Sequence, residues 1–172
     1  MNSKLYLLFG LSLLISSCAR KYDPVQPYIE NRQYNRQPNS VFDAALSVAT
    51  LMNLNVAVIE KSSGLIRFEA DSLGAGLLDQ YCKPHIVDSK GRPKYTFTEW
   101  NEDLLDENLP PLIGRAQVTL LVSVTDGKTN INLRTNFRAG DIAVNSTGIL
   151  EKTFLRYLEE KLGGDSRTRF NY

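Results

Sequence analysis

The chain has 172 residues, of which 42% are hydrophobic, 23% charged and 9% aromatic. These values are close to the average for globular proteins, and they exclude a disordered, a collagen-like or a disulfide-dense chain. The 20 basic and 19 acidic residues nearly balance, so net charge gives no electrostatic reason to expect nucleic-acid binding.

The first 17 residues have the features of a secretory signal. One cation, Lys4, precedes an apolar run over residues 5–15 that is too short to anchor the chain across a bilayer. A single transmembrane anchor is also disfavoured by the polar sequence that follows residue 18. We therefore expect residues 1–17 to be a signal peptide that is removed.

The end of this segment resembles the bacterial lipobox, the recognition site of lipoprotein signal peptidase. Ile15, Ser16 and Ser17 stand immediately before Cys18. The resemblance implies that the Cys18 sulfur is joined to diacylglycerol, that the chain is cut before it, and that the new amino group is acylated. The alternative is a plain secretory signal in which the cysteine falls near the cut by chance.

Residue 19 is alanine rather than aspartate. By resemblance to the enterobacterial sorting rule, this favours delivery to the outer membrane, with the protein held by its acyl chains and facing the periplasm. The inner membrane and the cell surface are the alternatives. Because a lipidated Cys18 leaves Cys82 without a partner in the chain, we expect no disulfide bond.

Residues 18–39 are polar and contain three prolines, a composition typical of a flexible tether between the lipid and a folded domain. Within it, residues 28–36 carry enough apolar surface to dock as an edge strand. The first clear helix is expected from Ser40, whose spacing to Asp43 fits a capping pair, up to the stop signal at Asn53.

Two β-hairpins are predicted. Residues 56–59 and 66–70 are β-prone segments that flank a turn at Gly64, and residues 116–124 and 131–137 alternate apolar and polar side chains around Asp126-Gly127. A final helix is expected after a cap at residues 146–147, ending at residues 163–164. Residues 164–172 are expected to be a loose tail.

These elements predict an α+β fold: a two-layer sandwich in which an antiparallel sheet of four to five strands has two helices on one face. The folded domain is expected to span residues 40–163 and to contain an insertion at residues 71–114. Within the insertion we expect a strand over residues 95–100 and a short acidic helix over residues 101–108.

The segment VFDAALSVATLMNLNVAVIEKSSGLIRFEA, the later hairpin and the closing NSTGILEKTFLRYLEEKL are similar to small α+β modules of proteobacterial outer-membrane lipoproteins, such as the BamC-like modules of the barrel-assembly machinery. The resemblance covers residues 28–163 in pattern. It implies a lipid-tethered periplasmic binding or accessory module and supplies no catalytic residues.

Two groups of residues have spacings that suggest chemistry. Cys82, His85 and Asp88 are spaced like metal ligands or a thiol–imidazole pair, but a structural zinc site needs four ligands and residues flanking a proline rarely align for catalysis. An ordinary loop is the simpler interpretation. The acidic residues between 99 and 107 are interpreted as a solvated surface, so we expect no metal site and no cofactor.

The strand over residues 130–138 presents a polar face that includes Asn132, Arg134, Asn136 and Arg138. Such a row of amides and guanidiniums suits a partner peptide, a carbohydrate or a phosphate, although an ordinary solvated sheet face has the same pattern. We expect a non-enzymatic envelope module that engages another envelope protein. The alternatives are an envelope hydrolase and a lipoprotein that binds lipid or glycan.

Overall fold

The computed structural model describes residues 25–83, 86–87 and 93–163. The expected signal peptide, Cys18, His85, Asp88 and the tail over residues 164–172 lie outside these described residues.

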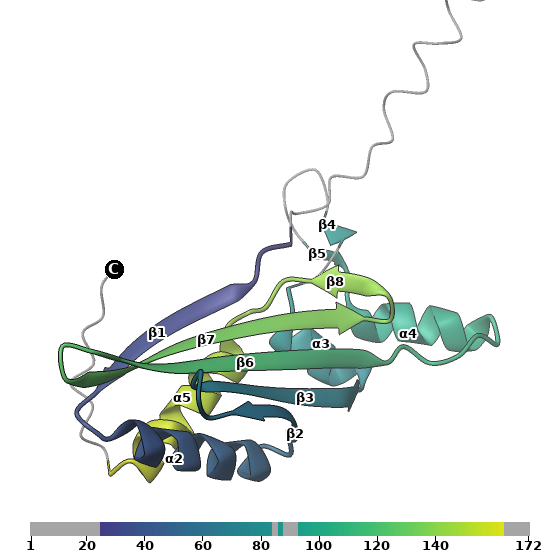
Figure 1. Cartoon of the computed structure of the whole chain (residues 1–172). Coiled ribbons are helices and arrows are strands. Elements are labelled where there is room, and N and C mark those ends of the chain that lie inside the picture. The colour runs from purple at the N-terminus through teal and green to yellow at the C-terminus, as the bar shows by residue number, and fades with distance from the viewer. Residues whose placement is uncertain (1–24, 84–85, 88–92, 164–172) are drawn as a thin grey trace, which may run out of the picture.

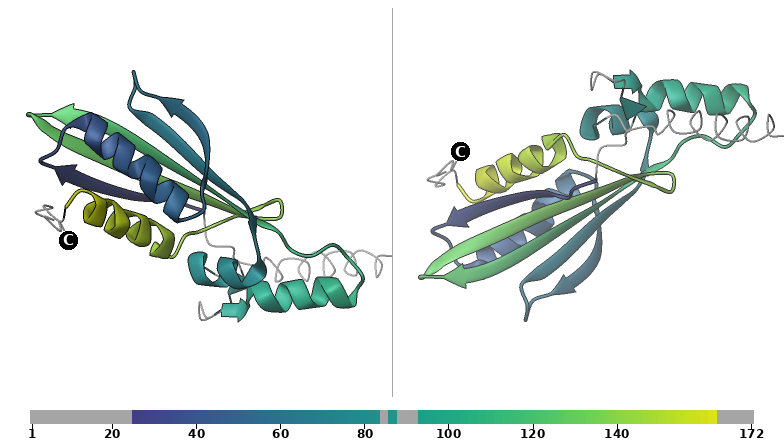
Figure 2. Two further views of the ribbon diagram at one scale, coloured as in Figure 1. Left: turned by 90° about the horizontal axis from the view of Figure 1, so that it is seen from below. Right: turned by 90° about the horizontal axis from the view of Figure 1, so that it is seen from above.

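The central element is a six-stranded antiparallel sheet with the order β1-β7-β6-β3-β2, to which β8 adds by pairing with β7. Its strands are β1 (Tyr28–Tyr34), β2 (Asn55–Glu60), β3 (Leu65–Leu73), β6 (Gly114–Thr125), β7 (Lys128–Ala139) and β8 (Ile142–Val144). Helices α2 (Pro38–Leu51) and α5 (Ile149–Lys161) both lie across one face of the sheet (Figures 1 and 2). The predicted two-layer α+β sandwich is therefore confirmed, with six strands rather than four or five.

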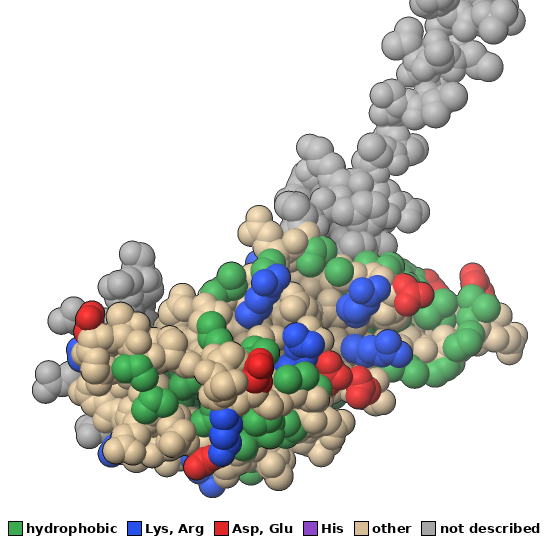
Figure 3. Space-filling view, viewed as in Figure 1, with side chains coloured by type: hydrophobic (Ala, Val, Ile, Leu, Met, Phe, Trp, Pro, Cys, Tyr) green, Lys and Arg blue, Asp and Glu red, His purple; other side chains and the backbone are tan. Residues whose placement is uncertain are grey.

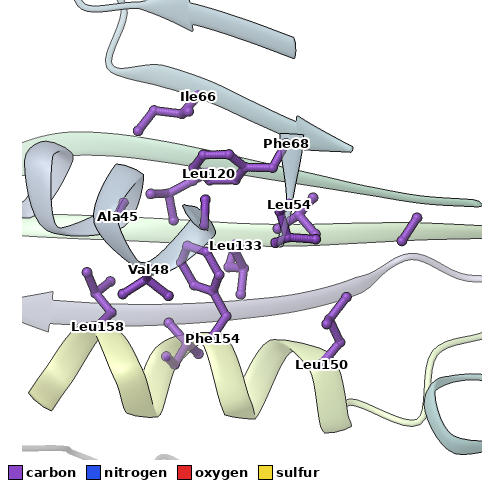
Figure 4. Close-up of a cluster of buried hydrophobic side chains, with 14 of the residues drawn as sticks. Ala45, Val48, Leu54, Ile66, Phe68, Leu120, Leu133, Leu150, Phe154 and Leu158 are labelled. Carbon is purple, nitrogen blue, oxygen red and sulfur yellow. The ribbon is translucent and has the colours of Figure 1, made fainter. Parts of the chain in front are cut away.

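The core fills the space between this sheet and its two helices (Figure 4). Phe68, Leu120 and Leu133 point from the strands toward the side chains of α2 and α5. The rings of Phe68 and Phe154 lie 5.7 Å apart between centroids, a separation at which aromatic pairs attract each other. The apolar stripes of the two helices and the alternation of the strands meet in this layer, as amphipathic elements require.

Strand β1 shows that the folded unit begins before Ser40. Residues 28–34 pair with β7 over seven consecutive residues, and Tyr34 at the end of the strand is only 2% exposed. The boundary expected at residue 39 is thus too late, and the sequence alternative of a docked edge strand is the one observed. A composition with few aliphatic residues does not prevent such docking, because main-chain hydrogen bonds to β7 and the burial of Tyr34 hold the strand in place.

Helix α2 begins two residues earlier than expected. Pro38 occupies its first turn and Gln37 is the cap residue, without a side-chain hydrogen bond. The predicted cap at Ser40 with Asp43 is wrong because the fixed φ of proline already suits the first helical position. The predicted stop is confirmed: the helix ends at Leu51, and Asn53 follows with φ +55°.

The insertion contains helices α3 (Ala75–Tyr81) and α4 (Phe97–Asp106) and the short strands β4 (Ile86–Val87) and β5 (Pro93–Tyr95), grouped at one end of the sheet (Figure 1). The strand expected over residues 95–100 is wrong. Thr96 and Glu99 form a reciprocal capping box that starts α4 at Phe97. Asp79 of α3 accepts the backbone N–H groups of Phe97 and Thr98 at 2.6 and 3.0 Å, which ties the two helices together.

Helix α5 begins after Gly148, whose φ of +83° makes it the cap residue in place of the expected residues 146–147. Ser146 still takes part, because the Gly148 N–H donates to Ser146 Oγ at 2.9 Å. The helix ends before Gly163, with φ +84°, as the sequence predicted. No helix among the described residues is long and apolar enough to cross a membrane.

Candidate binding face of the sheet

The face of the sheet opposite α2 and α5, here called the open face, carries the polar side chains of β7. Along this strand Leu133, Thr135 and Phe137 are buried beneath the helices, and the residues between them point the other way. The four candidate residues Asn132, Arg134, Asn136 and Arg138 therefore share the open face. Figure 2, right, views the molecule from the side on which the strands pass in front of α2.

The candidate residues differ in their local contacts. Asn132 Nδ2 donates to Asn31 Oδ1 of β1 at 2.8 Å, and Arg138 Nη2 donates to the Asp141 carbonyl at 2.6 Å. Within the described residues Arg134 and Asn136 make no side-chain hydrogen bond. Asn132 and Arg138 are thus oriented by neighbours, and Arg138 keeps donors that this contact does not use.

A groove of about 440 Å³ lies on the open face. It includes Asn136 and Arg138 but not Asn132 or Arg134, so the structure divides the four residues that the sequence grouped together. Its wall comes from four strands and from the segment before β1. The lining residues that carry charge or an amide on these strands are Glu69, Asp71, Arg115, Gln117, Asn136 and Arg138.

The strand register sets the order of charges in this groove. Arg115 of β6 stands directly opposite Arg138 of β7, and Gln117 stands opposite Asn136. On β3, Glu69 is paired with Gln117 and accepts its Nε2–H at 3.1 Å. Basic and acidic side chains are accordingly interspersed on the surface over the sheet in Figure 3.

Sequence reasoning assigned no role to Glu151, a fully buried carboxylate at 1% exposure. Its Oε2 accepts the Ser146 hydroxyl at 3.0 Å, while its Oε1 is buried without a hydrogen-bond partner in the described part of the chain. Burial raises the pKa of Glu151, and the nearby hydroxyls of Ser146 and Thr135 oppose this shift without cancelling it. The signal was present, because Glu151 precedes Phe154, Leu155 and Leu158 by three, four and seven positions on the apolar stripe of α5.

Cys82 lies at the end of α3 with an exposure of 1%. Burial, followed by the charges of Glu151 and Asp79, raises the pKa of its thiol to about 12. A thiol in this state is protonated at neutral pH, whereas reactive cysteines have a lowered pKa and partial exposure. Across the described ranges, no three His, Cys, Asp or Glu side chains gather in a way that would hold a metal ion.

The acidic residues between positions 99 and 107 lie on or beside α4. Glu99 belongs to the capping box, and the other four are exposed to solvent: Glu102, Asp103, Asp106 and Glu107.

No protein-family model matches the chain, and no curated protein matches it at a significant level.

Proposed function

We propose that this protein is a non-enzymatic, lipid-anchored module of the Gram-negative outer membrane that binds another envelope protein from the periplasmic side. In this proposal, acyl chains on Cys18 hold the protein to the bilayer, and no cofactor takes part. Several buried acyl chains, at about 0.8 kcal/mol per methylene, make such an anchor effectively permanent.

The observation that carries the proposal is the open face of the sheet. Helices α2 and α5 cover the opposite face (Figure 2). The open face presents arginine and asparagine side chains along β7, together with the groove beside them. An antiparallel sheet tolerates a solvated face, but guanidinium and amide groups in a row are also the donors that polypeptide recognition uses.

The alternatives have less support from the geometry. A hydrolase using Cys82 would need an activated thiol, and this one is buried with a raised pKa. A lipid site between the sheet and the helices would need open space, and that layer is filled by packed apolar side chains such as Leu120, Leu133 and Phe154 (Figure 4).

Two measurements in cells test the proposal. Cys18→Ala should move the protein from the membrane fraction to the soluble fraction or leave it unprocessed. A photo-crosslinking amino acid at position 132 should give a discrete crosslinked product with an envelope protein, while the same group at the exposed Lys152 of α5 should not. Unchanged membrane fractionation of the Cys18 variant, or identical products from both positions, would contradict the proposal.

A further inference from the structure

The groove on the open face places two arginines against each other. Arg115 and Arg138 are direct cross-strand neighbours of β6 and β7, and like charges in such a pair destabilise a sheet. Within the described residues neither guanidinium makes an ion pair with a carboxylate. The Asp141 carbonyl accepts from one nitrogen of Arg138 and leaves its other donors available.

A negatively charged group between the two guanidiniums would remove their repulsion. Each guanidinium presents donors in a planar fork that fits the two oxygens of a carboxylate. The amide of Asn136, two residues before Arg138 on β7, also lines the groove and has no hydrogen-bond partner in the described part of the chain. The groove therefore offers a convergent set of donors at one end.

The β3 side of the same groove carries the opposite charge. Glu69 and Asp71 line it there. They lie one strand spacing from Arg115 on β6 and two strand spacings, about 10 Å, from Arg138 on β7. Two arginines and two carboxylates make the groove neutral as a whole. A multiply charged phosphate or an anionic membrane surface would be repelled by the two carboxylates, whereas a ligand with one negative and one positive group matches both ends.

We propose that this groove binds an extended polypeptide segment of the partner, with a carboxylate on Arg115 and Arg138 and a lysine or arginine toward Glu69 and Asp71. In an extended segment, side chains two residues apart lie on the same face, about 7 Å apart. Long side chains at those two positions reach both ends of the groove. This inference rests on the proposed function and specifies the chemistry of the partner at that site.

The test uses the full protein purified from membranes in detergent, with ¹⁵N-labelled arginine. The probe is the peptide Ac-Lys-Val-Glu-NH₂, and a second peptide with glutamine in place of glutamate is its control. The Nε–H signals of Arg115 and Arg138 should shift on titration with the first peptide, and the glutamine peptide should bind at least tenfold more weakly. Arg115→Gln and Arg138→Gln should each weaken binding at least tenfold, while Arg156→Gln on α5 makes the same chemical change without an effect.

Three outcomes would overturn the inference: no shift of either arginine signal, equal binding of the two peptides, or tighter binding of inorganic phosphate than of the glutamate peptide. The cellular crosslink from position 132 is a separate measurement outside the groove. If that crosslink persists while the peptide fails, the ligand chemistry is wrong and the binding role stands. If the peptide binds as expected and the crosslink is absent, the proposed ligand chemistry of the groove is supported and the proposed binding of an envelope protein is contradicted.

Discussion

The burial of Glu151 makes the stability of this protein depend on pH. Its folded-state pKa is raised above the ordinary value of 4.5 by desolvation, with a smaller contribution in the same direction from the charge of Glu30. A raised pKa means that the folded state binds the proton more tightly than the unfolded state. The stability contributed by protonated Glu151 is therefore complete below about pH 4.5 and is lost as the pH rises through the folded-state pKa.

Glu151→Gln removes this loss, because the amide stays neutral at every pH. We expect the variant and the parent to have similar free energies of unfolding at pH 4, and the variant to be more stable by about 1–3 kcal/mol at pH 8, the typical cost of an unsatisfied buried polar group. Urea denaturation at both pH values measures the difference. Glu160→Gln on the exposed side of the same helix should show no such trend, and a difference that does not change with pH would contradict the prediction.

For single side chains, the sequence pattern predicted the structure correctly where one periodicity applied and wrongly where two competed. The alternation along β7 placed Asn132, Arg134, Asn136 and Arg138 on one face correctly. Thr96 and Glu99 were assigned to a strand because residues 95–100 also alternate, although their spacing fits a capping box. The groove itself was not predictable, because it joins β3, β6, β7 and the segment before β1, whose proximity depends on the sheet order.

At the scale of elements, both predicted hairpins form, but their turns have different surroundings. Gly64 between β2 and β3 and Gly127 between β6 and β7 each have φ +72°. The Gly64 carbonyl accepts the Val122 N–H at 2.9 Å, so this turn is attached to the neighbouring strand β6. A Cβ on Gly64 would lie 2.0 Å from the Val122 oxygen, while a Cβ on Gly127 meets nothing within 4 Å.

Alanine substitutions at these two glycines separate backbone strain from lost space. Gly127→Ala should cost about 1–2 kcal/mol, the penalty of an L-residue in the left-handed region. Gly64→Ala should cost at least about 2 kcal/mol more, because the β2–β3 turn must move away from β6. Thermal and urea unfolding of the two variants provide the comparison. Equal destabilisation would show that the contact with Val122 does not hold the turn.

The starts of the helices were the least predictable features of the elements. At α2 and α5 the sequence offered Ser40 and residues 146–147 as caps, yet the helices begin after Gln37 and Gly148. Proline in the first turn of α2 and a left-handed glycine before α5 determine these starts. Both signals are local, but they compete with nearby serine and threonine residues that fit the usual capping preference.

Across the whole fold, the sheet order explains why the sequence did not predict which strand β1 pairs with. The central order β7-β6-β3-β2 follows from two hairpins and the pairing of β3 with β6. The pairing of β1 with β7 joins residues that are about a hundred positions apart, and no local pattern specifies that contact. The strand covers the edge of β7, and Thr129 Oγ1 of β7 also donates to the Arg36 carbonyl at 2.5 Å.

A chain that begins at Asn35 lacks β1 but keeps Gln37, Pro38 and all of α2. It loses the seven-residue pairing and the buried Tyr34, a large core side chain whose removal alone costs roughly 3–5 kcal/mol. It also exposes the long edge of β7 to pairing with other chains. Compared with a chain that begins at Ala19, we expect a lower urea midpoint and association in sedimentation experiments. If the shortened chain is monomeric with an unchanged midpoint, β1 is an accessory strand and the folded unit begins at α2.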